Sequence, residues 1–146
     1  MTELPRYILG VDPGKKSGIA LYDLMFEVCE GWELQDPAYG DMIESLIERY
    51  RPAVVVEQFI INAATVKNTQ APWSLENVGV ARHLAQKYGV PFERQPQSSA
   101  KRFATNERLQ ALGWYVPGRG HMADAQRQVL LYIAKNGWWA PALDET

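Results

Sequence analysis

The chain has 146 residues, of which 47% are hydrophobic and 22% charged, and its formal net charge is −2. This length and composition fit one globular domain that buries its own core, and the single cysteine, Cys29, excludes an internal disulfide and a thiolate zinc site. No run approaches the roughly 20 apolar residues of a membrane helix, and residues 1–6 lack the apolar stretch of a signal peptide, so we expect a cytoplasmic protein without a membrane partner.

The N-terminal part is predicted to form three strands and a helix. Residues 7–12 are a β-rich run ended by Pro13-Gly14, and residues 18–23 resume extended structure after this tight turn. Residues 26–34 alternate loosely between apolar and polar side chains, which is typical of a half-exposed antiparallel strand. Apolar residues then recur at helical spacing over residues 39–50, and Pro52 ends this helix.

The remaining elements complete an α/β pattern. The run Val54-Val55-Val56 does not alternate, which predicts a central strand buried on both faces. Residues 62–73 are polar and irregular, and Ser74 starts a helix that reaches residue 84. Residues 90–92 open a weaker fifth strand, for which Pro91 suits an edge position. Residues 123–134 form the last helix, before Asn136-Gly137. This order predicts an α/β domain with a mixed sheet.

Three acidic residues end or begin these elements. Asp12 ends the first strand, Glu57 ends the buried strand, and Asp124 opens the last helix, three residues after His121. If the two strands lie side by side, the carboxylates converge, and a hard divalent cation makes their joint ionisation tolerable. We therefore predict a Mg²⁺ or Mn²⁺ site. Taken singly, each acid has a structural alternative, as a turn residue, an exposed strand end or a complement to a helix dipole.

Three motifs carry a family resemblance: Ile8-Leu-Gly-Val-Asp12-Pro-Gly14, Val56-Glu57-Gln58 and His121-Met-Ala-Asp124-Ala125. In these motifs and their order the chain resembles the RuvC-type Holliday junction resolvases of the RNase H-like superfamily. The resemblance implies a single nuclease domain over residues 1–146, with a mixed five-stranded sheet flanked by helices. It also implies a homodimer, encoded by a bacterium or a phage, that cuts four-way DNA junctions.

The resemblance suggests roles for further residues. Lys15 and Lys16 lie in a DNA-contacting loop, which is one residue shorter here than in the family. Lys101 corresponds to a basic segment near the scissile phosphate, where it either stabilises developing charge or makes an ordinary phosphate contact. Phe59 or Trp73 would stack at the junction centre, because Ile60 stands where some relatives have an aromatic residue.

His121 stands where many relatives have Asp and others have His, so it is a metal ligand, a proton donor or a helix cap. With Asp12, Glu57 and Asp124 it would bind two Mg²⁺ ions, for which Mn²⁺ would substitute, about 3.5–4 Å apart. Such a pair generates the attacking hydroxide and stabilises the leaving oxygen, so the products carry 5′-phosphate and 3′-hydroxyl ends.

The charge is distributed unevenly along the chain. Residues 23–57 contain nine acidic and two basic side chains, whereas residues 60–119 contain eight basic and three acidic ones. The second segment offers a polyanion a basic surface. We assign the following cations to backbone phosphates, with plain solvation as the alternative: Lys67, Arg102, Arg108 and Arg119.

Other functions remain open at this stage. A nuclease for RNA or for an RNA–DNA hybrid would use the same carboxylates, and a junction-binding module would keep the fold without catalysis. A sugar-kinase or actin-like ATPase would need two such domains. Val78, Ala81 and Ala85 share one helix face, which either forms a dimer seam or packs on the sheet.

Overall fold

A mixed five-stranded sheet forms the centre of the structure, a computed structural model that describes residues 5–58 and 71–138. The strands are β1 (Tyr7–Asp12), β2 (Lys16–Asp23), β3 (Val28–Gln35), β4 (Ala53–Gln58) and β5 (Phe92–Pro96), in the order β3-β2-β1-β4-β5. β2 pairs antiparallel with both β1 and β3, and β4 lies parallel to both β1 and β5. The predicted α/β fold with a mixed five-stranded sheet is confirmed.

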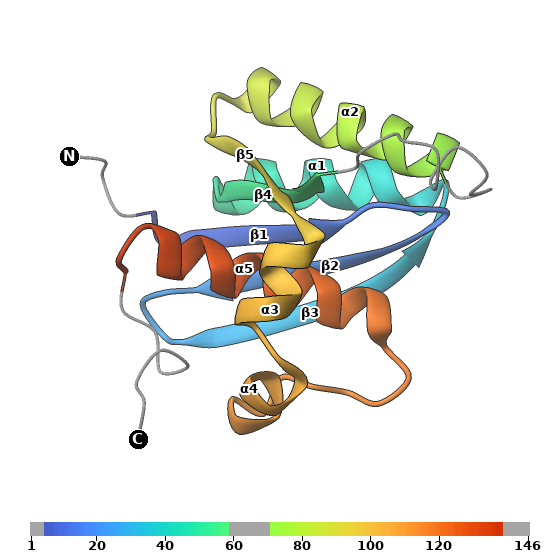
Figure 1. Cartoon of the computed structure of the whole chain (residues 1–146). Coiled ribbons are helices and arrows are strands. Elements are labelled where there is room, and N and C mark those ends of the chain that lie inside the picture. Colours follow the sequence, from blue (N-terminus) through green and yellow to red (C-terminus); the bar gives the residue numbers. More distant parts are fainter. Residues whose placement is uncertain (1–4, 59–70, 139–146) are drawn as a thin grey trace.

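Helices cover both faces of this sheet (Figure 1). One face packs against α1 (Ala38–Tyr50) and α2 (Ala71–Tyr88), and the other packs against α5 (Gly120–Lys135). Two short helices, α3 (Gln97–Phe103) and α4 (Asn106–Ala111), lie beside α5. Among the described residues, no helix is long and apolar enough to cross a membrane.

Strand alternation decides which side chains face α5. Leu9 and Val56 pack in the core with α1 and α2, whereas Ile8 and Val55 pack in the core with α5. Successive side chains of a strand point to opposite faces, so every second residue shares a face. Asp12 therefore lies on the α5 side of β1, and Glu57, two residues after Val55, lies on the same side of β4.

Two glycines let α5 approach the backbone of the sheet. A Cβ atom on Gly10 would lie 2.3 Å from the carbonyl oxygen of Ala125, and one on Gly18 would lie 1.8 Å from that of His121. Both distances are far below van der Waals contact, and both obstacles are backbone atoms of α5. The first turns of α5 therefore rest directly on β1 and β2, which brings the start of this helix to the ends of the strands.

Gly10→Ala is therefore expected to destabilise the protein, because its methyl group must push α5 away from β1. Overpacking of this kind costs about 1–3 kcal/mol of the free energy of unfolding. Gly79→Ala in α2 is the matched control, since a Cβ atom there meets nothing within 4 Å. This control should stabilise the protein by about 0.5–1 kcal/mol through helix propensity. Urea unfolding measures both, and equal stability of Gly10→Ala and wild type would contradict the close approach.

Several predicted boundaries are wrong by a few residues. The second strand and the last helix begin earlier than predicted, at Lys16 and Gly120, and the helix predicted from Ser74 begins at Ala71. The third strand begins later, at Val28. The fifth strand follows Pro91 instead of containing it, because it forms by parallel pairing of Phe92–Pro96 with β4.

The helix face formed by Val78, Ala81 and Ala85 packs in the core with α1 and the sheet. All three side chains are buried there. Of the two alternatives for this face, packing on the sheet is the one that the structure shows, so these residues do not provide a dimer seam.

Candidate active site

Asp12 and Glu57 lie side by side at the ends of two parallel strands. Val11 pairs with Val56 in the register of β1 and β4, and each acid directly follows one of these valines. The two carboxyl groups share a hydrogen bond, in which Glu57 donates to Asp12. The two strands do lie side by side, which is the condition for the acids to converge, and the two carboxyl groups are in direct contact.

Burial controls the ionisation of this pair. It raises the pKa of the Asp12 carboxyl, which is only 7% exposed, and the negative charge of Asp124 raises it further. Burial also raises the pKa of Glu57, as do its hydrogen bond to Asp12 and the charge of that residue. Two buried carboxylates this close repel each other when both are ionised, so without a cation the pair retains a proton.

Helix α5 contributes the other two predicted ligands. His121 Nδ1 lies 3.1 Å from Asp12 Oδ2, within hydrogen-bonding distance. Asp124 lies near enough for its charge to act on Asp12 and Glu57, but its own oxygens are engaged elsewhere. Arg127 Nη1 donates to Asp124 Oδ1 over 3.2 Å, and Gln97 Nε2 donates to Asp124 Oδ2 over 3.4 Å.

The donor set fits a hard divalent cation in its chemistry, because it offers carboxylate oxygens and one imidazole. In residues 5–58 and 71–138, however, no three His, Cys, Asp or Glu side chains are arranged to hold a metal ion. Of the four predicted ligands, Glu57 and His121 each contact Asp12. Asp124 instead accepts hydrogen bonds from Arg127 and Gln97. Metal binding would therefore require these side chains to move closer together.

The raised carboxyl pKa values predict how pH and metal affect stability. Folding raises the pKa of such a carboxyl above its unfolded-state value of about 4. Its contribution to the free energy of unfolding is complete below this unfolded-state pKa. The contribution is lost as the pH rises through the folded-state pKa. The metal-free protein should therefore lose stability as the pH rises from about 4 through the Asp12 pKa of about 6 and on to the Glu57 pKa of about 10. A bound cation replaces the proton shared by Asp12 and Glu57, so Mg²⁺ or Mn²⁺ should raise Tm more at about pH 8 than at about pH 5.

Thermal unfolding followed by circular dichroism, with metal or with EDTA, measures this difference. The Asp12→Asn/Glu57→Gln double variant is the control and should lose most of the metal-dependent rise in Tm. An equal rise in wild type and double variant would contradict a metal site at these residues.

The turn after Asp12 is held by α2, which the sequence did not predict. Ser74 Oγ donates to the carbonyl of Pro13 over 3.0 Å, and Asn77 Nδ2 donates to that of Gly14 over 2.9 Å. Ser17 Oγ accepts from Gly14 N over 3.1 Å. Ser74 and Asn77 stand out in the sequence only as helix-start residues, yet both are buried and fix the backbone beside Asp12.

A further acid, Glu33 on β3, lies near the site and was also missed. Its side chain is 2% exposed, and it accepts a hydrogen bond from Met122 N at the start of α5. Lys16 Nζ lies 3.3 Å and Arg119 Nη1 3.8 Å from Glu33 Oε1. Burial raises the pKa of Glu33, but the hydrogen bonds from Met122 N and Lys16 and the charge of Lys16 outweigh it, so the pKa is lowered. Glu33 thus anchors α5 and orients two of the cations predicted to contact DNA.

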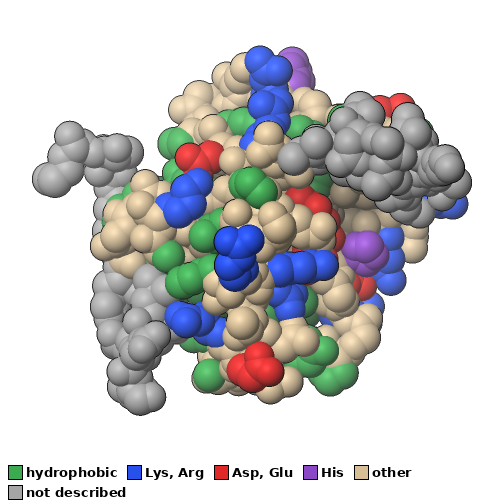
Figure 2. All heavy atoms as spheres, in the orientation of Figure 1, with side chains coloured by type: hydrophobic (Ala, Val, Ile, Leu, Met, Phe, Trp, Pro, Cys, Tyr) green, Lys and Arg blue, Asp and Glu red, His purple; other side chains and the backbone are tan. Residues whose placement is uncertain are grey.

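Lys101, on α3, lies near the carboxyl pair. Its positive charge lowers the pKa of both Asp12 and Glu57, and its side chain is exposed to solvent. An exposed cation beside buried carboxylates can contact a substrate phosphate bound over them. Figure 2 shows Lys and Arg side chains on the α3 side of the molecule, with acidic side chains visible beside them.

The other predicted DNA contacts lie on several different elements. Lys15 Nζ lies 5.3 Å from the centre of the Trp73 ring, so these two predicted residues are neighbours. Arg102 is exposed, and the guanidinium of Arg108 lies 4.7 Å from the centre of the Phe103 ring. Phe59 and Lys67 lie outside the described residues, so the structure does not decide between Phe59 and Trp73 as the stacking residue.

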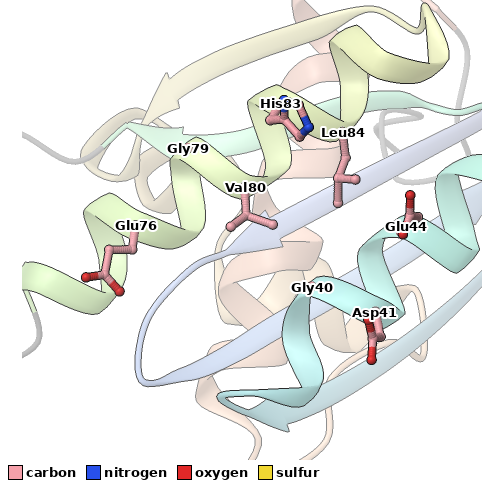
Figure 3. Close-up of a pocket in the computed structure, with 8 residues that line it drawn as sticks. All are labelled: Gly40, Asp41, Glu44, Glu76, Gly79, Val80, His83 and Leu84. Carbon is pink, nitrogen blue, oxygen red and sulfur yellow. The ribbon is translucent and has the colours of Figure 1, made fainter.

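A groove between α1 and α2 lies on the opposite face of the sheet (Figure 3). Its acidic lining residues are Asp41, Glu44 and Glu76, and Val80 and His83 also line it. Three carboxylates there would repel a polyanion. A nucleic acid is therefore expected to bind on the α3 and α5 side of the molecule, where the predicted site lies.

Two solved structures have a similar fold. The structure of T. thermophilus RuvC in complex with Holliday junction substrate matches with a TM-score of 0.70 and 20% identity, covering 90% of this chain and 96% of that one. The Thermus thermophilus RuvC structure matches with a TM-score of 0.69, 21% identity and the same coverage. No protein-family model matches the sequence, and comparison with curated proteins finds no match. The chain has a RuvC-like fold, as the sequence motifs predicted.

Proposed function

We propose that this protein is a divalent-metal-dependent endonuclease that cuts branched DNA, including four-way junctions, and leaves 5′-phosphate and 3′-hydroxyl ends. The observation that carries the proposal is the contact between the buried Asp12 and the half-buried Glu57 at adjacent strand ends. Burial of two carboxyl groups is unfavourable in a purely structural role, whereas a nuclease needs such a pair to bind cations.

The proposed roles follow from the position of each side chain. Asp12, Glu57 and Asp124 would hold two Mg²⁺ ions, with His121 as a further ligand or as a hydrogen-bond partner of Asp12. When bound, such ions supply an activated water and stabilise the leaving oxygen. Lys101 would neutralise charge on the phosphate, because it is exposed and lies near both carboxyls.

Branched DNA is proposed as the substrate on two grounds. The fold is similar to that of a RuvC protein whose structure was solved with a Holliday junction substrate. Lys101 also lies near the carboxyls, Arg119 lies beside Glu33, whose charge acts on Asp12, and both cations would contact phosphates. One active site makes one nick, so symmetrical resolution of a four-way junction would need a homodimer with two-fold symmetry.

The test compares cleavage of a mobile four-way junction, its linear duplex, a single-stranded RNA and an RNA–DNA hybrid, at one ionic strength with Mg²⁺ or Mn²⁺. Preferential and paired nicking of the junction, together with a dimeric mass by light scattering, is the expected result. Equal nicking of junction and duplex by a monomer would contradict junction resolution. Preference for RNA or the hybrid would assign a different substrate, and binding without any cleavage would identify a junction-binding module.

A further inference from the structure

Arg127 is a buried arginine on α5, one helical turn after Asp124. The residue is 9% exposed, and burial of a guanidinium is costly unless its donors are paired. All three nitrogens donate hydrogen bonds: Nε to the carbonyl of Ala104 over 2.9 Å, Nη1 to Asp124 Oδ1 over 3.2 Å, and Nη2 to Asn106 Oδ1. The guanidinium group of Arg127 therefore links Asp124 to the segment that connects α3 and α4.

Two hydrogen bonds to side chains of α5 fix α3 at both of its ends. Gln97, the first residue of α3, donates to Asp124 Oδ2, while Ala104, which directly follows α3, accepts from Arg127. Lys101 lies between these two attachments, on the helix that they hold. Arg127 thus helps to fix both the position of Lys101 near the carboxyl pair and the orientation of Asp124, together with Gln97.

The two oxygens of Asp124 are held unequally. Oδ1 accepts a charge-assisted bond from Arg127, whereas Oδ2 accepts a longer bond of 3.4 Å from the neutral amide of Gln97. A cation that binds Asp124 displaces the weaker partner more easily. Oδ2 is therefore the oxygen available to a metal ion, while Arg127 keeps Oδ1 and with it the orientation of the carboxylate.

We propose that Arg127 is a positioning residue, which holds Asp124 so that one oxygen turns to the metal and which fixes α3 with Lys101 over the same site. This inference rests on the proposed metal-dependent function. Hydrogen-bond partners of metal ligands change metal affinity by about 10–100-fold when they are removed. Lysine does not replace such an arginine, because its ammonium group cannot hold three acceptors in one plane.

The experiment measures Mn²⁺ affinity of the full chain by titration calorimetry without DNA. Arg127→Met should weaken Mn²⁺ binding by about 10–100-fold, and Arg127→Lys should lie between this variant and wild type. Gln126→Met is the matched control, because Gln126 is also buried on α5 and donates to a backbone carbonyl, that of Trp114, over 3.1 Å. It should bind Mn²⁺ as wild type does, so a loss confined to Arg127 cannot result from a general loosening of α5.

Asn106→Ala keeps the experiment decisive if Arg127→Met does not fold. Asn106 is exposed, and its truncation removes one of the three acceptors of Arg127 without creating a buried cavity. A several-fold weaker Mn²⁺ affinity is expected. If Arg127→Met folds and binds Mn²⁺ with wild-type affinity, the proposed role of Arg127 is wrong. If only Asn106→Ala folds, wild-type Mn²⁺ affinity of that variant leads to the same conclusion. Either result leaves the proposed nuclease function intact. Absence of Mn²⁺ binding by wild type would overturn both.

Discussion

Asp12→Asn is expected to abolish DNA cleavage, with a rate reduced by more than about three orders of magnitude. Metal ions contribute several kcal/mol of charge stabilisation to phosphate cleavage, and about 4 kcal/mol corresponds to this factor. Glu57→Gln and Asp124→Asn should have similar effects, because all three carboxylates would bind the same ions. Single-turnover cleavage of a labelled four-way junction measures each rate. The double variant Asp12→Asn/Glu57→Gln should be little slower than either single variant, since such ligands act as a unit.

Folding and DNA binding should survive these substitutions. Asparagine at position 12 removes a buried negative charge and keeps an oxygen that accepts the Glu57 proton, so the metal-free variant should unfold at a temperature no lower than wild type at neutral pH. Asp41→Asn, in the groove between α1 and α2, is the matched control for loss of one acidic charge and should leave cleavage unchanged. Cleavage by folded Asp12→Asn at the wild-type rate would disprove the assignment of the active site.

The second large effect is expected for DNA binding by the triple variant with alanine at Arg102, Arg108 and Arg119. Each true phosphate contact releases counterions and contributes about 0.9 to the slope of log affinity against log salt. The slope should decrease by about 2 to 3, because Arg119 also pairs with Glu33 and is partly neutralised in the protein. Affinity at low salt should fall similarly for all sequences, since phosphate contacts do not distinguish bases.

The control for this variant removes three cations from the other face. Arg49, Arg82 and Lys87 are exposed on α1 and α2, beside the acidic groove. Their replacement by alanine changes the net charge equally, so any general effect of charge should appear in both variants. Filter binding or fluorescence anisotropy across a salt series measures the slopes. Equal slopes in the two triple variants would place the DNA on a different surface.

The sequence predicted the central strands well because their signals are local. Three consecutive valines indicate a strand buried on both faces, and Asp12 and Glu57 lie at the ends of the two strands that pair. The neighbouring position of these acids therefore follows from the hydrophobic pattern and strand pairing alone. The orientation of Asp124 did not follow, because it depends on Arg127 and Gln97 and on a helix that was not predicted.

The missed elements lack a local signal. Helices α3 and α4 have seven and six residues, too few for a clear apolar period, and their position depends on contacts with α5. The fifth strand was misplaced because Phe92–Pro96 is mostly polar. Its buried Gln95 is paired with Gln128, far away in the sequence, by a 2.8 Å hydrogen bond between the two side chains. Such long-range partners cannot be recognised from the residues around Gln95.

The contact of α5 with the backbone at Gly10 and Gly18 also bears on how relatives of this chain can be found. The spacing of the site is set there by main-chain atoms, so aliphatic residues elsewhere on this face can exchange while the carboxyls keep their positions. Sequence divergence is then expected to erase the core pattern before it erases the two glycines. A search pattern for this geometry has an aspartate with one glycine two residues before it and another six residues after it, followed much later by His-x-x-Asp. In this chain these positions are Gly10, Asp12, Gly18, His121 and Asp124. Chains that share this pattern should place α5 at the same height over the sheet, whatever the rest of their sequence.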